Sequence, residues 1–385
     1  MKKLRVGVIY GGRSGEHEVS IASAASVIKH LDRSRYEPIP IRIEKDGRWT
    51  IADRAPTAIS AAEVIEQARL HAPRSPRPGR ETVLVAHPSE DTLVTIERRP
   101  AKGSDVDQAV VTGLGLDVVF PILHGPYGED GTVQGLLELA NVPYVGPGVM
   151  ASAVGMDKAV MRVLFVARGL PVAPWLSLIR RDWECDRAAV TAGLQTLGLP
   201  IFVKPANLGS SVGITKVKST DELAAAIDHA LEFDRKVVVE AAVPEAREIE
   251  CAVLGNDEPQ ASMPGEVIPS REFYDYEAKY LDAGSQTIIP ADLPADQIAE
   301  VQRLAIEAFR AVDAAGMSRV DFLLARSTGI IYVNEINTIP GFTTISMYAK
   351  MWEASGVSYP TLVDRLIQLA IDRHTEKQRL RTSVM

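Results

Sequence analysis

Short apolar runs and helical spacing alternate at the start of the chain. Leu4 to Tyr10 form an apolar, β-branched run that ends at Gly11-Gly12, and Pro38 to Ile43 form a second such run. Between them, residues from Val19 to Leu31 carry apolar and small side chains at the spacing of one helix face. A strand, a helix and a strand in this order predict the beginning of a doubly wound α/β domain, in which the strands run parallel.

The same patterns predict elements along the rest of the chain. A stripe of apolar residues runs from Val301 to Val312 at helical spacing, and Gly316 is a natural stop for that helix. Asp221 is well placed to cap another helix. The predicted strands cover 82–86, 92–96, 116–122, 141–145, 199–203, 214–217, 237–240, 319–325 and 330–337, and the further predicted helices cover 58–70, 132–140, 157–168, 221–231 and 359–371.

The pattern is weakest between residues 44 and 112. Residues 71–80 hold three prolines and a glycine, which predicts an irregular loop. The two short strands expected nearby do not extend a clear periodic pattern. We therefore interpret this stretch as a surface insertion rather than as part of a site.

Composition narrows the class of protein. Of 385 residues, 46% are hydrophobic and 24% are charged, which is typical of a soluble globular protein of two or three domains. The two cysteines, Cys185 and Cys251, exclude a disulfide scaffold and indicate a reducing compartment, so we expect a cytoplasmic protein. No apolar run approaches the ~20 residues of a membrane helix, and no signal-peptide pattern is present. The net charge of −8 argues against a nucleic-acid binder.

The predicted hairpin of residues 318–337 carries the strongest candidate chemistry. If its turn centres near Thr328, Asp321 lies opposite Glu335 and Arg319 lies opposite Asn337. Side chains alternate between the two faces of a strand, so these four would share one face, with Leu323 and Val333 beside them. Three oxygen donors and a guanidinium suit Mg²⁺ and phosphate. The alternative is a solvated face with cross-strand salt bridges, and a register slip of one residue would undo the arrangement.

A second candidate site follows the strand that ends at Lys204. The loop Ala206-Asn-Leu-Gly-Ser-Ser-Val-Gly213 is rich in small residues, and consecutive backbone N–H groups in such a loop can bind an anion. Ser210 and Ser211 could add hydroxyl donors. The P-loop pattern is absent. An ordinary hairpin turn remains the alternative.

Two further segments carry charged residues that do not fit a core. Residues 11–20 follow the first strand, at the sheet edge where α/β proteins bind ligands. Glu16 there could bind an ammonium group. For Glu18, a role as a helix-capping acid fits as well as a ligand-binding role. Residues 273–280, with Lys279, are interpreted as a mobile lid that reaches a phosphate, or as an exposed helix with ion pairs. His124 and Glu129 are weak signals alone.

Five motifs taken together resemble the D-alanine–D-alanine ligases, a family of ATP-grasp enzymes of peptidoglycan precursor synthesis. In chain order they are GGRSGEHEVS, HGPYGEDGTVQG, VKPANLGSSVG, YDYEAKY and NEINTIPGFT, and they span the chain from Gly11 to about Ser346. The resemblance implies an ATP-grasp fold with three domains. These are an N-terminal α/β substrate-binding domain (1–150), a central ATP-grasp subdomain (151–240), and a C-terminal subdomain (241–385) with the lid loop and the metal site.

The resemblance also implies roles for the amino-acid site. Glu16 would hold the ammonium of the first D-alanine, supported by Ser210 and Tyr280, and His124 would lie near that substrate's carboxylate. Arg319 and the backbone of Gly341 would stabilise the transferring phosphoryl group and the oxyanion. The pocket for the carboxylate of the second D-alanine would be formed by Ser346 and Met347.

For ATP and its metal, the resemblance implies a second set of residues. Magnesium or manganese, as two ions, would be bound by Asp321, Glu335 and Asn337. The segment from Pro244 to Arg247 holds an extra residue relative to the family pattern. The nucleotide would be contacted by Lys158, Lys204, Ser211, Glu240, Val243, Glu248 and Lys279.

The implied reaction is the ATP-dependent ligation of two D-alanines through a D-alanyl phosphate, with release of ADP and phosphate. D-alanine–D-lactate ligases typically have histidine where this chain has Tyr280, so Tyr280 favours an amine acceptor. D-Serine, also an amine, stays open as an alternative acceptor. A nucleotide-binding module without catalysis is a third hypothesis. The resemblance further implies a homodimer, with no membrane or nucleic-acid partner.

Overall fold

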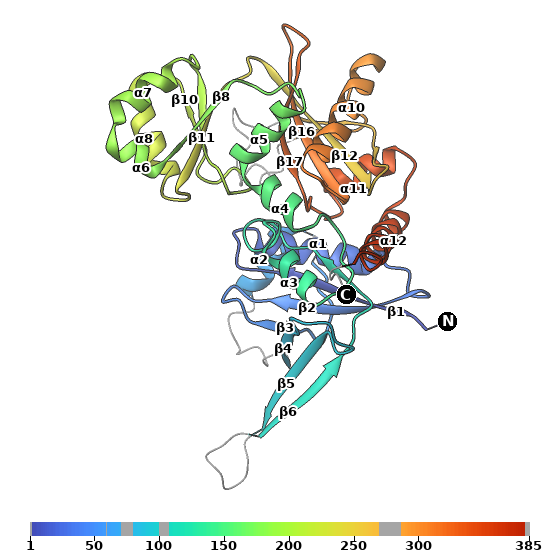
Figure 1. Cartoon of the computed structure of the whole chain (residues 1–385). Coiled ribbons are helices and arrows are strands. Elements are labelled where there is room, and N and C mark those ends of the chain that lie inside the picture. Colours follow the sequence, from blue (N-terminus) through green and yellow to red (C-terminus); the bar gives the residue numbers. More distant parts are fainter. Residues whose placement is uncertain (1, 59, 71–79, 100–107, 269–285, 382–385) are drawn as a thin grey trace.

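The strands of the chain form three separate sheets. The computed structural model describes residues 2–58, 60–70, 80–99, 108–268 and 286–381. Its three sheets follow one another in sequence and occupy different parts of the molecule (Figure 1). The N-terminal sheet forms the lower body, the central sheet lies at the upper left, and the C-terminal sheet lies at the upper right.

The N-terminal sheet contains the predicted strand, helix and strand. Its strands are β1 (Leu4–Gly11), β2 (Tyr36–Ile43), β3 (Trp49–Ile51), β4 (Arg80–Leu84), β5 (Leu93–Arg99), β6 (Gln108–Leu114) and β7 (Val118–Pro121), in the order β6-β5-β4-β3-β2-β1-β7. Strand β1 runs parallel to β2 and β7, and the other neighbours pair antiparallel. Helices α1 (His17–His30) and α3 (Thr132–Leu139) pack into the cores on its two faces.

Residues 44–112 do more than form a surface insertion. The strands predicted at 82–86 and 92–96 are confirmed as β4 and β5, and the predicted helix as α2 (Ala61–Leu70). Strands β3 and β6 were not predicted. Strand β3 has only three residues, and β6 lies in the stretch where the hydrophobic pattern is weakest, so neither shows a clear period-two alternation. Strands β3, β4, β5 and β6 together extend the sheet by four strands. The strand predicted at 141–145 is wrong, since only Tyr144 forms a bridge there, to Val119.

The central sheet is antiparallel throughout. Its strands are β8 (Trp175–Ile179), β9 (Ile201–Pro205), β10 (Thr215–Val217) and β11 (Lys236–Ala241), in the order β10-β9-β11-β8. Helices α6 (Arg180–Cys185), α7 (Arg187–Gln195) and α8 (Thr220–Ala230) pack on it. The cap predicted at Asp221 is wrong. Ser219 is the N-cap of α8, and the Glu222 carboxylate accepts the Lys218 N–H at 2.8 Å.

The C-terminal sheet presents one face to a helix and the other to the candidate site. Its strands are β12 (Ala246–Gly255), β13 (Gln260–Ala261), β14 (Gly265–Ile268), β15 (Gln286–Ile288), β16 (Gly316–Ala325) and β17 (Ile331–Asn337). Helix α10 (Ala295–Ala311) buries the predicted stripe from Val301 to Phe309 against β12, β16 and β17, and Val312, just past the end of the helix, lies in the same core. Burial of each large apolar side chain stabilises the fold by about 1.5–3 kcal/mol.

The stop of α10 differs from the prediction. The helix ends at Ala311, Asp313 takes a positive φ of 56°, and Gly316 instead opens β16. A left-handed residue at Asp313 reverses the chain sooner than the glycine would, since aspartate tolerates this conformation.

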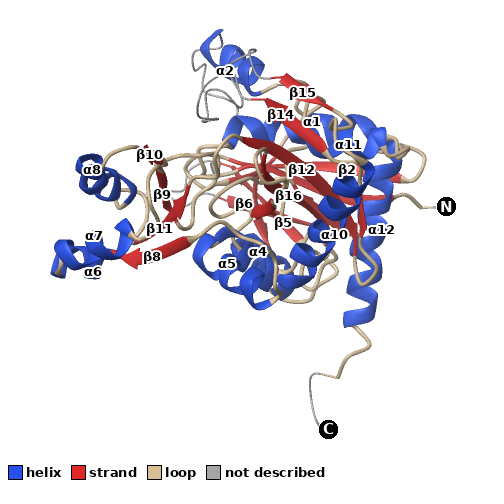
Figure 2. Ribbon diagram, turned by 90° about the horizontal axis from the view of Figure 1, so that it is seen from above, coloured by secondary structure: helices blue, strands red, loops and turns tan. Residues whose placement is uncertain are grey.

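Four more helices join the bodies. Helix α4 (Val149–Met156) and α5 (Lys158–Ala167) pack on the C-terminal sheet, with Met161 and Phe165 in its core. Helix α11 (Met347–Ala354) and α12 (Tyr359–Lys377) pack into a core that they share with the N- and C-terminal sheets. Seen from above, both helices lie on the side of the molecule opposite the central sheet (Figure 2). Leu366 of α12 shares one core with Val6 of β1. This shared core fixes the two sheets that border the site. Among the helices described, none is both long and apolar enough to cross a membrane.

Candidate functional site

One cavity gathers the predicted residues from all three sheets. It has a volume of about 480 Å³ and lies between β9 and β11 of the central sheet and β12, β16 and β17 of the C-terminal sheet. Lys279 and Tyr280 lie outside the described residues. Every other predicted site residue lines the cavity, namely Glu16, His124, Lys158, Lys204, Ser210, Ser211, Glu240, Val243, Glu248, Arg319, Asp321, Glu335, Asn337, Gly341, Ser346 and Met347.

The hairpin of β16 and β17 has the predicted register at its charged end. Arg319 pairs with Asn337, and Asp321 pairs with Glu335. The Arg319 guanidinium donates to both Asp321 oxygens, at 2.6 and 2.7 Å, and the Asn337 amide donates to Asp321 at 3.0 Å. Burial would lower the pKa of Arg319, but Asp321 and Glu250 raise it well above the usual value. The guanidinium therefore stays charged in a partly buried position.

The prediction for the other end of this hairpin is wrong for Val333. The register shifts after Asp321, so that Phe322 pairs with Val333 and Leu323 pairs with Tyr332. This β-bulge turns Val333 into the core beneath α10, where it is fully buried, while Leu323 stays in the cavity. The bulge also turns Asn334 toward the cavity.

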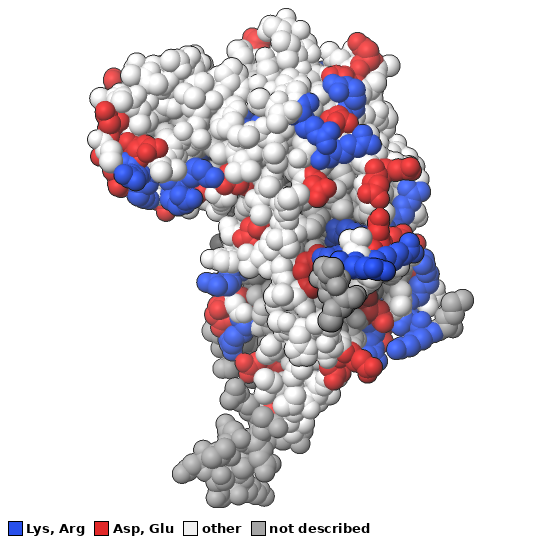
Figure 3. Space-filling model, viewed as in Figure 1, with Lys and Arg blue, Asp and Glu red and all other residues white. Residues whose placement is uncertain are grey.

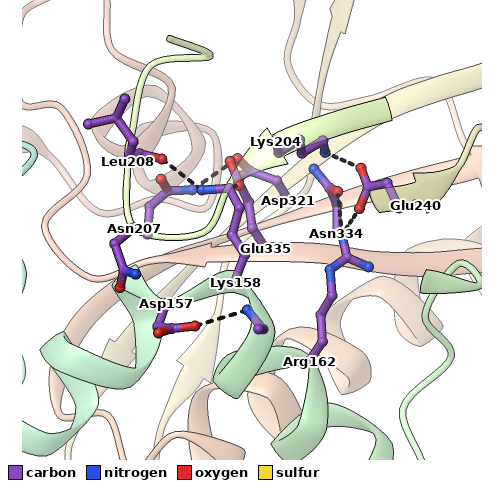
Figure 4. A network of polar contacts seen from close by, with 12 residues as sticks. Asp157, Lys158, Arg162, Lys204, Asn207, Leu208, Glu240, Asp321, Asn334 and Glu335 are labelled. Carbon is purple, nitrogen blue, oxygen red and sulfur yellow. Dashed lines mark hydrogen bonds and ion pairs between the residues drawn. The ribbon is translucent and has the colours of Figure 1, made fainter. Parts of the chain in front are cut away.

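At one end of the cavity, which the resemblance assigns to ATP and which we call the nucleotide end, three cations meet two carboxylates (Figure 4). Lys158 Nζ lies 3.6 Å from Glu335 and donates to the Leu208 carbonyl at 2.8 Å. Glu240 is ion-paired to both Lys204 and Arg162. Burial would raise the pKa of Glu240, but Arg162 and Lys204 outweigh it and the pKa is lowered. Glu240 is therefore an ionised carboxylate held between two cations.

The loop after Lys204 has the special backbone that a small-residue loop allows. Ser210 and Ser211 both have positive φ, 52° and 58°. The loop also joins the antiparallel strands β9 and β10, so the hairpin interpretation is confirmed, while anion binding by the loop stays a prediction. The Ser210 hydroxyl donates to the Glu16 carboxylate, which joins the central sheet to the N-terminal sheet.

The opposite end, which the resemblance assigns to the amino acids and which we call the amino-acid end, holds two carboxyl groups, of which Glu16 is buried and Glu129 is half-buried. Glu16 follows β1, and Glu129 lies in the loop after β7, where its carboxylate accepts the Gly125 N–H at 2.9 Å. Gly209 backs both, since a Cβ there would lie 3.2 Å from Glu16 and 3.9 Å from Glu129. Burial first, and then the charge of Glu16, raise the pKa of Glu129 to about 8. The raised pKa favours the protonated form of Glu129.

His124 is a neutral side chain fixed on both ring nitrogens. Burial lowers its pKa. Nδ1 lies 3.0 Å from the Ile339 carbonyl, which can only accept, so Nδ1 carries the proton. Nε2 then accepts from Ser23 of α1 at 3.2 Å. Glu18, by contrast, forms an ion pair with Lys45 at 2.7 Å, which favours its structural interpretation.

Residues 341–347 close the amino-acid end. Ser346 is the N-cap of α11, and its hydroxyl accepts the Thr343 N–H at 2.9 Å. A Cβ at Gly341 would lie 3.0 Å from Ser346 Oγ, so the backbone approaches this hydroxyl closely. Met347, the first residue of α11, lines the cavity beside it.

Four residues of the site carried too little sequence signal to be predicted. Glu129 was a weak candidate, and Arg162, Glu250 and Lys350 were none. Arg162 lies one helical turn after Lys158, and this spacing was the available signal. Glu250 pairs with Arg319 at 3.2 Å from the neighbouring strand β12. Lys350 lies one turn into α11.

The donor set of the hairpin fits a magnesium ion bound together with phosphate. Asp321, Glu335 and Asn337 offer hard oxygen ligands on paired positions of two strands. Within the described ranges, no three His, Cys, Asp or Glu side chains cluster as a metal site of their own. Two carboxylates and an amide are the set expected where nucleotide phosphates and water complete the coordination.

Two family models match the chain and cover most of it. The model described as D-ala D-ala ligase N-terminus matches residues 5–147, and the model described as D-ala D-ala ligase C-terminus matches residues 164–368. A curated relative from Heliobacterium modesticaldum, named D-alanine--D-alanine ligase, is 49% identical over 381 residues and covers 98% of each chain.

Solved structures resemble the whole chain as well. The D-alanine-D-alanine ligase from Coxiella burnetii matches with a TM-score of 0.78 at 38% identity, covering 98% of this chain and 97% of that one. The VanG D-Ala:D-Ser ligase from Enterococcus faecalis matches with a TM-score of 0.81 at 33% identity, covering 96% and 100%.

Proposed function

The chain belongs to the D-alanine–D-alanine ligase family, and from this premise we propose that it joins two D-alanines to D-alanyl-D-alanine at the expense of ATP. The fold is that of the ATP-grasp ligases. The observation that carries the proposal is that one cavity combines a cation-rich nucleotide end with an amino-acid end built around Glu16. ADP, phosphate and a dipeptide for peptidoglycan precursors are the products.

The first step is transfer of the γ-phosphoryl group to the carboxylate of the donor D-alanine. Glu16, with Ser210 and Tyr280, holds the donor ammonium, and His124 borders its carboxylate. Phosphoryl transfer needs positioning and neutralisation of spreading charge rather than covalent help from the protein. Lys158, Lys204, Ser211 and Lys279 provide this for the phosphates, and Glu240, Val243 and Glu248 hold the adenosine.

The second step is attack of the acceptor amine on the acyl carbon of D-alanyl phosphate. As the C–N bond forms, the carbonyl oxygen becomes an oxyanion. The C=O bond then re-forms, inorganic phosphate leaves with the electrons of the broken C–O bond, and the proton lost by the amine nitrogen passes to the departing phosphate. The Arg319 guanidinium and the Gly341 N–H lie where donors can stabilise that charge, and such donors act strongly in a buried site. Ser346 and Met347 receive the carboxylate of the acceptor.

We assign Asp321, Glu335 and Asn337 to the metal, as magnesium or manganese and as two ions. When bound, the metal neutralises phosphate charge during transfer. Within the protein itself, Lys158 lies beside Glu335 and Arg319 lies beside Asp321. These ion pairs hold the two carboxylates that we assign to the metal.

D-Alanine is the acceptor that best fits the relatives and the sequence. The Heliobacterium relative is named for D-alanine, and Tyr280 favours an amine. The VanG structure, a D-Ala:D-Ser ligase, makes D-serine the second candidate. The test is phosphate release from Mg-ATP with D-alanine alone and with D-alanine plus D-serine or D-lactate. We expect release with D-alanine alone, and no release would contradict the proposal. Normal ATP binding without any turnover would favour a non-catalytic module.

The three sheets support a division into three domains, although α4 and β11 each cross a proposed boundary by one or two residues. We propose residues 1–150, 151–240 and 241–385 as the three domains, with the cavity between them. We also propose a cytoplasmic location, because the reaction consumes ATP and the two cysteines suit a reducing compartment.

We assign the homodimer contact to the outer face of α3, α4 and α5. Six of nineteen exposed large apolar side chains in the described chain lie here, namely Leu139, Val149, Met150, Val160, Val163 and Val166. Between residues 131 and 167 no charged side chain is exposed, and Figure 3 shows a largely uncharged strip over these helices. Such a patch complements itself, because a two-fold contact brings no like charges together.

Sedimentation of a Val163→Glu variant tests this face. We expect a dimer for the unmodified chain and a monomer for the variant, since a charge would be buried at the contact. Val111→Glu is the matched control, because Val111 is equally exposed on the distant strand β6 and should leave the dimer intact. A monomeric unmodified chain would contradict the assignment.

A further inference from the structure

Lys350 differs from the other lysine and arginine side chains that line the cavity. Lys158 has Glu335 as its carboxylate partner, Lys204 has Glu240, and Arg319 has Asp321. Lys350 lines the same cavity, yet within the described part of the chain no carboxylate lies within 4.0 Å of it. A partly buried ammonium without a counter-charge is costly, so this position is suited to an anion from a ligand.

Helix α11 places Lys350 beside the pocket for the acceptor. Ser346, Met347 and Lys350 all line the cavity, and Lys350 follows Ser346 by about one turn of the helix. Tyr348, Met351 and Trp352, on the other side of α11, are buried in the core shared by the N- and C-terminal sheets. This packing fixes the helix, so Lys350 is presented from a rigid element rather than from a loop.

The anions available to the site are the phosphates and two carboxylates. The phosphates have Lys158 and Lys204 at the nucleotide end. Lys350 lies instead with Gly341 and Ser346, where the acceptor carboxylate is proposed to bind. At that place the helix N-terminus and the Ser346 hydroxyl supply only partial positive charge. A full positive charge would match the carboxylate directly.

Resting on the proposed function, we propose that Lys350 binds the carboxylate of the acceptor amino acid and selects acceptors that carry a free carboxylate. A charge-assisted hydrogen bond adds about 1.5–3 kcal/mol, which corresponds to about 10- to 100-fold in affinity. The effect falls on the acceptor and not on the donor, whose ammonium is recognised by Glu16.

The test compares Lys350→Met with Lys350→Arg and with Lys29→Met, a control at an exposed lysine of α1. The dependence of the initial rate on D-alanine gives two constants, one for each site. We expect Lys350→Met to raise only one of them, by about 10- to 100-fold, with the KM for ATP unchanged. Lys350→Arg should recover most of this loss, and Lys29→Met should match the unmodified enzyme.

D-Alaninamide, an acceptor without a carboxylate, gives a second reading. The unmodified enzyme should prefer D-alanine over the amide, and Lys350→Met should lose this preference by the same factor. Unchanged D-alanine constants, or an unchanged preference, in a Lys350→Met enzyme that turns over would overturn the role of Lys350. Absence of turnover in the unmodified enzyme would instead contradict the proposed function.

Discussion

The two ends of the cavity solve the problem of buried charge in opposite ways. At the nucleotide end, the protein neutralises its own charges, because Glu240 lies between Lys204 and Arg162 and Glu335 lies beside Lys158. At the amino-acid end, two carboxyl groups, Glu16 and Glu129, lie together, and burial first and then the charge of Glu16 raise the pKa of Glu129 to about 8.

The charges at the nucleotide end preorganise the site, whereas those at the amino-acid end serve to recognise a ligand. Paired charges hold the nucleotide end in shape before any ligand arrives, so phosphates enter a framework that is already ordered. The carboxyl groups at the other end favour a ligand that brings positive charge, such as the ammonium of an amino acid. Variants on each side can therefore be compared directly.

The largest expected effect is at the nucleotide end. Glu335→Gln removes the carboxylate beside Lys158 that is proposed to bind the metal, so we expect kcat to fall about 1,000-fold while the thermal midpoint stays close to that of the unmodified enzyme. Glu353→Gln, at an exposed position of α11, is the control and should not change kcat. Steady-state kinetics measure both, and full activity in Glu335→Gln would contradict the metal assignment.

The next effect is on folding. Arg162 is a buried partner of Glu240, and removing one member of a buried ion pair leaves the other charge poorly compensated. We expect Arg162→Met to lower the free energy of unfolding by about 3 kcal/mol, as measured by urea denaturation. Arg187, whose ion pair with Asp228 is exposed, provides the control. Arg187→Met should cost less than about 1 kcal/mol, and equal losses would refute the contrast.

The last effect concerns the amino-acid end and is a dependence of stability on pH. Because the folded-state pKa of Glu129 is raised to about 8, the folded protein binds more protons than the unfolded chain from about pH 4.5 to pH 8. Stability from this group is therefore present at low pH and is lost as pH rises, by up to about 1.4 kcal/mol per pH unit. Glu129→Gln should flatten this slope and be the more stable protein at pH 9. An unchanged slope would contradict a raised pKa.

The sequence predicted the charged end of the hairpin correctly because strands obey a simple rule. Alternation alone placed Arg319, Asp321, Glu335 and Asn337 on one face. It failed at Val333, because a β-bulge changes the phase of a strand without a marker in the sequence. The motifs that carry the family resemblance then identified site residues that lie far apart in the chain, such as Glu16 and Ser346.

Other parts depend on contacts that one sequence does not display. The partners of Arg162 and Glu250 lie on other elements, so their burial follows only from the three-dimensional packing. The raised pKa of Glu129 likewise needs both Glu16 and burial. Helix α12 packs into the same core as β1. The amphipathic spacing of a helix does not reveal which sheet the helix packs against.

The most direct test of the account follows oxygen from the donor to phosphate. D-Alanine labelled with ¹⁸O in both carboxylate oxygens is incubated with Mg-ATP and the enzyme, and the released phosphate is analysed by mass spectrometry. Attack of the donor carboxylate on the γ-phosphorus predicts one ¹⁸O atom in each phosphate, formed together with one ADP and one dipeptide. Phosphate without label would contradict an acyl phosphate, and with it the central claim that this cavity activates a carboxylate with ATP.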